Sequence, residues 1–208
     1  MTTVAVKICG ITRTEDARAA ARLGAHAVGF IFCGVSPRYI APAQAADIMR
    51  LLPPYVTTVG VFVNPSAAEV ESALAAASLN VLQFHGDESA EFCGQFGLPF
   101  VKAVRVKPDV DLLQYAEDFR AARALLLDAF VAGVHGGTGT GFDWALIPRG
   151  VPLPVILSGG LNAGNVAEAI DRVRPYAVDV SSGVESRPGV KDERKMAAFM
   201  KEVRSAGL

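Results

Sequence analysis

The chain has 208 residues and a formal net charge of −1, and 51% of its residues are hydrophobic while 20% are charged. This composition excludes a disordered chain, and the length favours one folded domain or at most two. The near-balanced charge removes the main electrostatic reason to expect a nucleic-acid partner, and since no apolar run approaches about 18 residues we expect no membrane span.

Eight short apolar runs recur along the chain at fairly even spacing and predict β-strands. They are rich in Val, Ile, Leu and Phe and are bounded by Gly, Pro, Asn or Asp, which is typical of strands buried on both faces. In chain order, the predicted strands cover residues 4–11, 27–32, 57–63, 81–85, 100–106, 124–129, 154–158 and 177–181.

An amphipathic stretch follows each predicted strand and carries a plausible helix start. The predicted helices end near residues 23, 52, 77, 96, 121, 147, 173 and 205. Their expected starts are, in chain order, Thr12 or Thr14, Pro42, Asn64 with Pro65, Asp87, Asp109 or Asp111, Asp143, Asn162 and Asp192.

Strands and helices thus alternate strictly, which predicts parallel strands joined by right-handed crossovers. Eight such units can close into a (β/α)₈ barrel, for which about 200 residues is the lower end of the usual length. A doubly wound open sheet is the alternative, but eight units without additional elements fit closure better. No linker or low-complexity tract divides the chain, so we expect a single α/β domain over residues 1–208.

Functional residues of such a barrel lie where the strands end. Cys9 lies next to Gly10 near the end of the first predicted strand. A cysteine is often only a small buried hydrophobic residue, but at a barrel mouth its thiolate can act as a base or a nucleophile. Side-chain alternation puts Lys7 on the same face as Cys9. If that face points inward, Lys7 needs a partner, and Asp179 on the adjacent eighth strand is the obvious candidate.

Asp128 lies near the end of the sixth predicted strand, directly after four apolar residues. A carboxylate in this place could cap a helix, but the segment that follows is rich in glycine rather than helical. The ends of the first and sixth strands lie roughly across the mouth of a closed barrel. Cys9 and Asp128 could therefore flank a small substrate as general base and general acid.

Glycines follow the seventh and eighth strands, in Gly159-Gly160 and Ser182-Gly183. These two loops frequently bind phosphate in (β/α)₈ enzymes, because glycines let backbone N–H groups approach the anion. Each pair alone could be an ordinary turn with positive φ. Two polar loops on adjacent strands favour the phosphate interpretation.

Two further segments lie near the predicted mouth. Arg38, after the second strand, is either a solvated surface residue or a guanidinium that captures a carboxylate or phosphate. The glycine-rich residues 131–141 are interpreted as a substrate-covering loop rather than a nucleotide loop, because they do not open a long helix after the first strand. His26 and His135 belong to no recognisable constellation and are assigned no role.

The three cysteines, Cys9, Cys33 and Cys93, are odd in number and scattered. This pattern argues against disulfides and structural zinc and fits a reducing cytoplasm. No cluster of His and carboxylate residues has metal-ligand spacing, and the first residues do not have the pattern of a secretory signal. We therefore expect a cytoplasmic protein that is not exported and that needs no metal.

Several strings together resemble the phosphoribosylanthranilate isomerase family. They occur in the family's order from residue 7 to residue 192, and the first and last are the most specific. The strings are Lys7-Ile-Cys-Gly-Ile-Thr12, Ser36-Pro-Arg-Tyr-Ile40, Gly60-Val-Phe-Val-Asn64, Gln83-Phe-His-Gly86, Gly136-Gly-Thr-Gly139 with Phe142-Asp-Trp144, Leu157-Ser-Gly-Gly-Leu161 and Asp179-Val-Ser-Ser-Gly-Val-Glu185.

The resemblance implies a single-domain TIM barrel of tryptophan biosynthesis, acting on a small phosphosugar without metal or redox cofactor, as a monomer or homodimer. The family performs an Amadori rearrangement of N-(5-phosphoribosyl)anthranilate to 1-(o-carboxyphenylamino)-1-deoxyribulose 5-phosphate. An acid protonates the furanose ring oxygen so that the ring opens to a Schiff base. A base then removes the C2′ proton, and the resulting enolamine tautomerises to the ketone.

By the same resemblance, Cys9 matches the general base and Asp128 the general acid, and Arg38 would hold the anthranilate carboxylate. His85 and Asp179 would line the mouth as substrate-binding residues. The phosphate would be held by backbone N–H groups of Gly159, Gly160, Ser182 and Gly183.

The residues agree with this chemistry. A thiol with an ordinary pKa of about 8.5 can serve as a base once a nearby cation favours the thiolate. Lys7 is the candidate cation, provided that Asp179 does not neutralise it.

Two rival functions remain open from the sequence. The aminoaldose isomerase of histidine biosynthesis has similar chemistry, but that family typically pairs two aspartates, so Cys9 argues against it. The other rival is a non-catalytic barrel that binds a phosphosugar or anthranilate. The presence of both Cys9 and Asp128 argues against a purely binding role.

Overall fold

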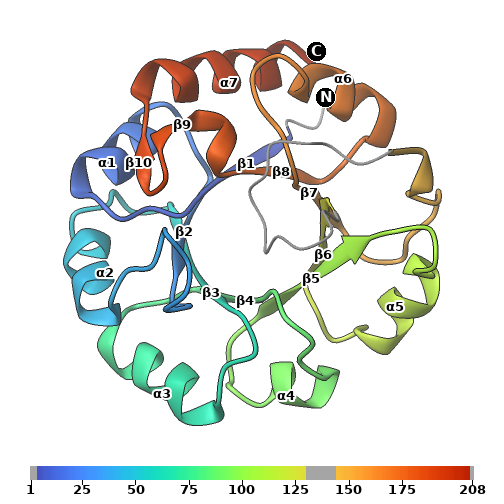
Figure 1. Ribbon diagram of the computed structural model, residues 1–208, viewed down its shortest axis with the longest axis horizontal. Coiled ribbons are helices and arrows are strands. Elements are labelled where there is room, and N and C mark those ends of the chain that lie inside the picture. Colours follow the sequence, from blue (N-terminus) through green and yellow to red (C-terminus); the bar gives the residue numbers. More distant parts are fainter. Residues whose placement is uncertain (1–3, 130–143, 207–208) are drawn as a thin grey trace.

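The computed structural model describes residues 4–129 and 144–206, and it forms a ring of parallel strands enclosed by helices (Figure 1). Neighbouring strands pair in chain order from β1 to β8, and β8 pairs with β1, so the barrel is closed. The expected (β/α)₈ barrel is confirmed, and the open doubly wound sheet is excluded. The strands are β1 Ala5–Cys9, β2 Ala27–Ile31, β3 Thr57–Phe62, β4 Val81–Phe84, β5 Phe100–Val106, β6 Ala124–Ala129, β7 Val155–Leu157 and β8 Ala177–Val180.

The predicted strands match these within one or two residues at each end. β1 was expected to extend to residue 11 but ends at Cys9, because Gly10 has a φ of 76° and turns the chain away from the ladder. β7 is shorter than predicted, since pairing begins at Val155 and ends at Leu157.

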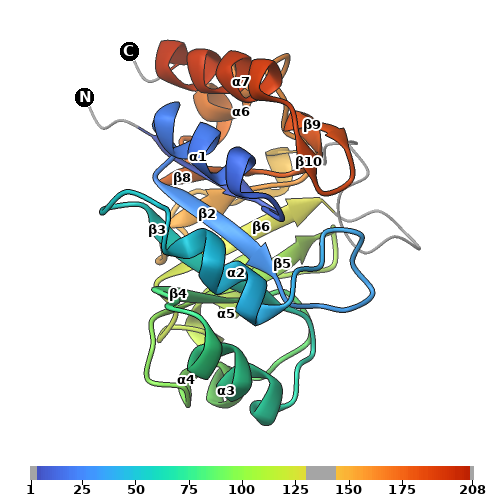
Figure 2. The ribbon, with the colours of Figure 1, turned by 90° about the vertical axis from the view of Figure 1, so that its left-hand side faces the viewer.

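Helices cover the outside of the ring (Figure 2). They are α1 Thr14–Arg22, α2 Pro42–Met49, α3 Ala67–Ala76, α4 Ala90–Gly94, α5 Leu112–Asp118, α6 Val166–Val173 and α7 Glu193–Ala206. The predicted helix of residues 143–147 is instead a 3₁₀ turn, η1 Trp144–Leu146, within the described part of the chain. None of the helices among the described residues is long and apolar enough to cross a membrane.

Several predicted helix starts are wrong because the expected cap has another partner. The Thr12 hydroxyl donates to the Gly189 carbonyl, and α1 instead begins after Arg13 without a side-chain cap. Asn64 has a φ of 47° and accepts a hydrogen bond from the Asp87 N–H, so neither residue caps a helix.

The helices α3 and α4 are instead capped by serines. Ser66 forms a capping box with Glu69, and Ser89 accepts from the Phe92 N–H. Asn162 accepts from the Gly164 N–H in a turn, and α6 starts later, after Asn165. Asp111, one of two expected caps, does cap α5.

The apolar residues form two layers. A large cluster packs between the strands and the helices, and includes Ile8, Phe30, Phe62, Phe84 and Leu127. Smaller clusters of alternating strand residues fill the barrel itself. Side chains that follow these interior positions toward the strand ends therefore face the mouth of the barrel.

A β-hairpin that the sequence analysis did not predict lies between β8 and α7. After the 3₁₀ turn η2 (Ser182–Val184), the hairpin consists of β9 Glu185–Arg187 and β10 Val190–Lys191. Figure 2 shows it at the end of the barrel toward which the strand arrows point. It therefore belongs to the face on which the candidate residues were expected.

Candidate active site

The predicted partnership of Lys7 and Asp179 is confirmed. The two residues are register neighbours on β1 and β8, and Lys7 Nζ donates to Asp179 Oδ1 over 2.7 Å. Their side chains are 7% and 6% exposed. Burial lowers the pKa of Lys7, but the adjacent Asp179 carboxylate and the Cys9 thiol together more than offset this effect, so the pKa lies above its ordinary value.

Cys9 lies two residues beyond Lys7 and is buried in the barrel interior with Val59 and Val61. A Cβ atom added to Gly29 on β2 would lie 2.8 Å from the Cys9 sulfur, so this glycine leaves the room that the sulfur fills. Burial raises the pKa of the Cys9 thiol, and the opposing effect of Lys7 does not reverse the shift. Asp179 also raises the pKa of Cys9, so it offsets part of the effect by which Lys7 favours the thiolate.

Asp128 lies one residue before the end of β6 with its side chain on the interior face, since Leu126 two residues earlier belongs to the interior cluster. Its Oδ2 atom is 3.1 Å from His85 Nε2, and His85 Nδ1 is 3.1 Å from Gln83 Nε2. Gln83 is 1% exposed and lies on β4. The structure therefore brings His85 and Asp128 together as a hydrogen-bonded pair on the β4–β6 side of the mouth.

Arg105 is a residue of this region that the sequence analysis missed. It is the register partner of Asp128 on β5 and is partly exposed. Alternation from Val101 and Ala103, both in the interior cluster, puts it on the interior face. The sequence contained a signal for Arg105. Val101 and Ala103 alternate with it along the predicted strand, so if they point inward, Arg105 also points inward, at the end of the strand where the mouth lies.

Arg38 is not a solvated surface residue. Its Nε and Nη2 atoms donate to the two carboxylate oxygens of Glu185, over 2.9 and 2.8 Å. The side chains are 12% and 4% exposed. Burial raises the pKa of Glu185, but the hydrogen bonds from Arg38 and the charge of Lys191 bring it below its ordinary value.

Lys191 and Glu185 were both missed as site residues. Lys191 Nζ donates to Glu185 Oε1 over 2.8 Å and to the Ser181 carbonyl over 3.2 Å. Burial lowers the pKa of Lys191, and the attraction of Glu185 offsets only part of this effect. Glu185 ends the last of the sequence strings that carry the family resemblance. The hairpin itself could not be predicted, because strands of two and three residues are too short to show a periodic pattern.

The two glycine loops lie against each other. Gly159 and Gly160 have φ angles of 85° and 68°, which favour glycine. A Cβ atom added to Gly183 would lie 1.9 Å from the Leu161 carbonyl oxygen, so any side chain there would collide with the loop after β7. Gly183 of η2 thus approaches the loop after β7 backbone to backbone.

The remaining residues that the sequence singled out lie away from this site or outside the described residues. The loop of residues 131–141, with His135, falls outside the described residues. His26 accepts a hydrogen bond from the Val6 N–H through Nδ1. Cys93 is fully buried in α4, and burial raises its pKa to about 11. Within residues 4–129 and 144–206, no group of three or more His, Cys, Asp or Glu side chains is arranged to hold a metal ion.

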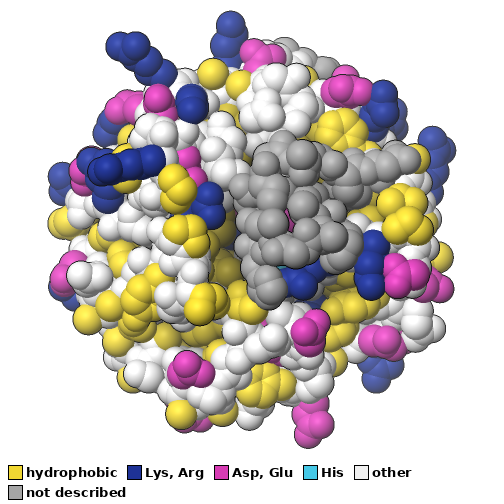
Figure 3. All heavy atoms as spheres, viewed as in Figure 1, with side chains coloured by type: hydrophobic (Ala, Val, Ile, Leu, Met, Phe, Trp, Pro, Cys, Tyr) yellow, Lys and Arg dark blue, Asp and Glu magenta, His cyan; other side chains and the backbone are white. Residues whose placement is uncertain are grey.

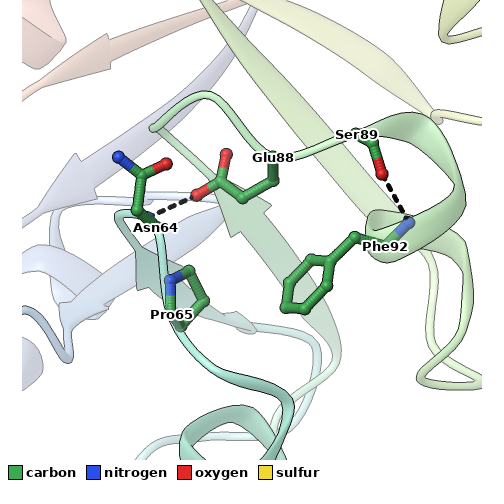
Figure 4. A pocket seen from close by; sticks show the side chains of 5 residues that line it. All are labelled: Asn64, Pro65, Glu88, Ser89 and Phe92. Atoms are coloured by element: carbon green, nitrogen blue, oxygen red, sulfur yellow. Dashed lines mark hydrogen bonds between the residues drawn. The ribbon is translucent and has the colours of Figure 1, made fainter.

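A further buried ion pair, between Lys102 and Glu88, lies outside the barrel interior. Lys102 Nζ donates to Glu88 Oε2 over 2.7 Å and lies 5.6 Å from the centre of the Phe119 ring. Glu88 also accepts a hydrogen bond from the Asn64 N–H. Both residues line a depression of about 310 Å³ together with Pro65 (Figure 4). This group connects the loops after β3 and β4 and contains none of the predicted site residues.

The surface around the mouth carries both signs of charge. Figure 3 shows Lys and Arg side chains interspersed with Asp and Glu side chains around the rim of the face seen in Figure 1. This distribution agrees with the net charge of −1.

Known proteins of one kind match the chain along almost its whole length. A family model described as N-(5'phosphoribosyl)anthranilate (PRA) isomerase matches residues 6–202. A protein named N-(5'-phosphoribosyl)anthranilate isomerase from Nitrosospira multiformis is 60% identical over 200 residues, which cover 96% of each chain.

Solved structures agree with the sequence relatives. The phosphoribosyl anthranilate isomerase of Thermotoga maritima superposes with a TM-score of 0.90 at 44% identity, covering 97% of this chain and 99% of that one. Monomers generated from the dimeric Thermotoga maritima enzyme superpose with a TM-score of 0.84 at 42% identity, covering 96% of this chain and 98% of that one. A phosphoribosyl anthranilate isomerase in complex with reduced 1-(o-carboxyphenylamino)-1-deoxyribulose 5-phosphate superposes with a TM-score of 0.85 at 42% identity. The match covers 97% of this chain and 99% of that one.

Proposed function

The chain belongs to the N-(5'-phosphoribosyl)anthranilate isomerase family, and we propose that Cys9 and Asp128 perform the proton transfers of its reaction. It is an isomerase of tryptophan biosynthesis that converts N-(5'-phosphoribosyl)anthranilate into 1-(o-carboxyphenylamino)-1-deoxyribulose 5-phosphate. The remaining question is how the residues of this chain divide that chemistry.

In the proposed mechanism, the Asp128 carboxyl group gives its proton to the furanose ring oxygen. The bond between this oxygen and C1′ breaks, and the aryl nitrogen supplies the electrons that form the iminium. Cys9, as thiolate, then removes the proton from C2′, and the electrons of this C–H bond neutralise the iminium to give the enolamine. Tautomerisation of the enolamine places a proton on C1′ and leaves the ketone at C2′.

One observation carries this assignment. A thiol on β1 and a carboxylate on β6 both lie on the interior face at the carboxyl end of the barrel, with β7 and β8 between them in the ring. His85 contacts one oxygen of Asp128, Oδ2, over 3.1 Å. A base and an acid on different strands can address two sides of one small substrate, as the two proton transfers require.

The ends of the substrate would be held by different parts of the mouth. Arg38 would bind the anthranilate carboxylate, since a guanidinium recognises a carboxylate through paired N–H donors. Asp179, together with His85, would line the mouth between the reacting groups. Backbone N–H groups would hold the phosphate in the two adjacent glycine loops, at Gly159, Gly160, Ser182 and Gly183.

We further propose that residues 1–208 act as one isomerase domain in the cytoplasm, as a monomer or homodimer. The partner is a small phosphosugar rather than nucleic acid or a membrane. Neither proton transfer needs a Lewis acid or an electron carrier, so the reaction should proceed without added metal or cofactor, and activity should survive chelation by EDTA.

Incubation with N-(5'-phosphoribosyl)anthranilate tests the proposal. The substrate fluorescence should disappear faster with the protein than in buffer, and Asp128→Asn should slow the loss by about 10²–10⁴-fold, the usual contribution of a positioned acid. Circular dichroism checks that the variant is folded. A folded Asp128→Asn enzyme that works at the wild-type rate would contradict the assignment of the acid.

A further inference from the structure

The hairpin β9–β10 brings two buried charged side chains to Arg38. Glu185 begins β9 and Lys191 ends β10, and their side chains are 4% and 0% exposed. The hairpin is tied to the rest of the molecule at its turn and at its end, since the Thr12 hydroxyl donates to the Gly189 carbonyl and Asp16 of α1 accepts from the Lys191 N–H over 3.0 Å. Glu185 and Lys191 are therefore held on a fixed frame.

Glu185 determines where the guanidinium of Arg38 points. Both carboxylate oxygens accept from Arg38, one from Nε and one from Nη2, so the plane of the guanidinium is fixed. The stem of Arg38 packs over Gly10, where an added Cβ would lie 2.7 Å from Arg38 Cδ. Glu185 takes two of the five N–H donors, and within the described residues the guanidinium makes no other hydrogen bond.

Lys191 changes the charge of this group. An isolated arginine–glutamate pair is neutral and attracts an anion weakly. Here Lys191 Nζ lies 2.8 Å from Glu185 Oε1, the oxygen that also accepts from Arg38 Nε. Two cations thus share one carboxylate, while Asp16 at the Lys191 N–H and Lys195 at the Glu185 carbonyl add one charge of each sign. One positive charge therefore remains in excess at a poorly hydrated place, where it acts more strongly than in water.

We propose that Glu185 and Lys191 are positioning residues that make Arg38 selective for an aryl carboxylate beside the reacting amine. Glu185 aims the free N–H donors of Arg38 toward the mouth, and Lys191 preserves the positive charge that Glu185 alone would cancel. The inference rests on the proposed role of Arg38, and it assigns the specificity for anthranilate over an uncharged arylamine to the hairpin.

The test compares two substrates that differ only in the carboxylate, N-(5-phosphoribosyl)anthranilate and N-(5-phosphoribosyl)aniline. The measured quantity is the ratio of their kcat/KM values, which is the preference for the carboxylate. Arg38→Ala should lower this ratio by about 10–100-fold, as expected for a hydrogen-bonded charge pair. Glu185→Gln and Lys191→Met should each lower it by about 3–10-fold, mainly through KM for the anthranilate substrate.

Glu88→Gln is the matched control, because it weakens another buried lysine–carboxylate pair outside the barrel. It should change the ratio less than about twofold, whatever it does to stability. In the Arg38→Ala background, Glu185→Gln should lower the ratio little further, since the two residues act on the same contact. If Glu185→Gln alone does not fold, the double variant Glu185→Gln with Lys191→Met removes both buried charges and should still lower the ratio.

The outcomes distinguish the role of Arg38 in binding the carboxylate from the positioning role of Glu185 and Lys191. An unchanged ratio in Arg38→Ala would overturn the proposed role of Arg38 in binding the carboxylate. A lowered ratio in Arg38→Ala, combined with an unchanged ratio in the folded hairpin variants, would overturn this inference alone. A fall in activity that is equal for both substrates would show that the hairpin is merely structural.

Discussion

Two buried lysine–carboxylate pairs in the molecule have nearly the same geometry and opposite surroundings. The N–O distance is 2.7 Å both in Lys7–Asp179 and in Lys102–Glu88. The first pair lies inside the barrel, two residues from the Cys9 thiol. The second lies between the strands and the helices, beside the Phe119 ring.

The difference shows that a buried ion pair does not by itself mark a site. Lys102 and Glu88 satisfy each other and the loop backbone, since Glu88 also accepts from the Asn64 and Gly86 N–H groups. Lys7 and Asp179 instead face the mouth of the barrel. The side of the strand on which a charged residue falls, rather than its burial or its partner, decides whether it can meet a substrate.

The largest effect that this comparison predicts concerns the thiol beside the inner pair. Cys9→Ala should retain the fold and product binding but lose about 10²–10⁴ in kcat, the usual contribution of a positioned base. Cys93→Ala in α4 and Cys33→Ala are the controls and should change kcat little. Steady-state kinetics on the three variants tests this, and normal turnover by Cys9→Ala would overturn the assignment of the base.

Breaking either pair should destabilise the protein, while only the inner pair should matter for turnover. Lys102→Met and Lys7→Met each leave a buried carboxylate unpaired, which costs about 3–5 kcal/mol of unfolding free energy. Urea denaturation measures this loss, and kcat is measured on the folded enzyme. We expect Lys102→Met to keep kcat within about threefold and Lys7→Met to lower it by about tenfold or more. Equal kcat losses in both variants would remove the distinction between the pairs.

Arg38 sharpens the comparison, because its pair with Glu185 is buried at the mouth but leaves three guanidinium N–H donors without a partner among the described residues. Arg38→Ala should raise KM by about 10–100-fold and change kcat less, since the carboxylate is remote from the reacting carbon and should be bound similarly in the ground and transition states. Initial-rate measurements over a range of substrate concentrations separate the two constants. A kcat that falls by orders of magnitude at fixed KM would assign Arg38 to the chemical step instead.

The inner pair, Lys7 with Asp179, could be predicted from the sequence, whereas for the outer pair only the burial of Lys102 could have been predicted. Alternation along a strand and closure of eight strands were sufficient to join Lys7 with Asp179. Lys102 stands in the middle of the apolar run Phe100–Val106, so its burial required a partner. The sequence does not show that this partner is Glu88, because the loop after β4 has no repeating pattern that fixes its path.

Contacts between irregular segments account for most of what the sequence did not predict. Ser66 and Ser89 cap α3 and α4 because Asn64 is held in a turn by the neighbouring loop. The pair of Glu185 with Arg38 joins residues 147 positions apart through a hairpin of two very short strands. Such contacts depend on how loops meet in three dimensions, which local propensity and hydrophobic periodicity do not determine.

The pH dependence of Cys9 alkylation, with and without bound product, tests most directly the claim that this thiol is the base in the mouth. Burial raises the pKa of Cys9, and only the thiolate reacts with iodoacetamide. Inactivation should therefore accelerate with rising pH through and beyond about 8.5, the ordinary thiol value. Product should protect the enzyme, and the modified peptide should contain Cys9. Inactivation that product does not slow, or that follows labelling of Cys33 alone, would contradict the account.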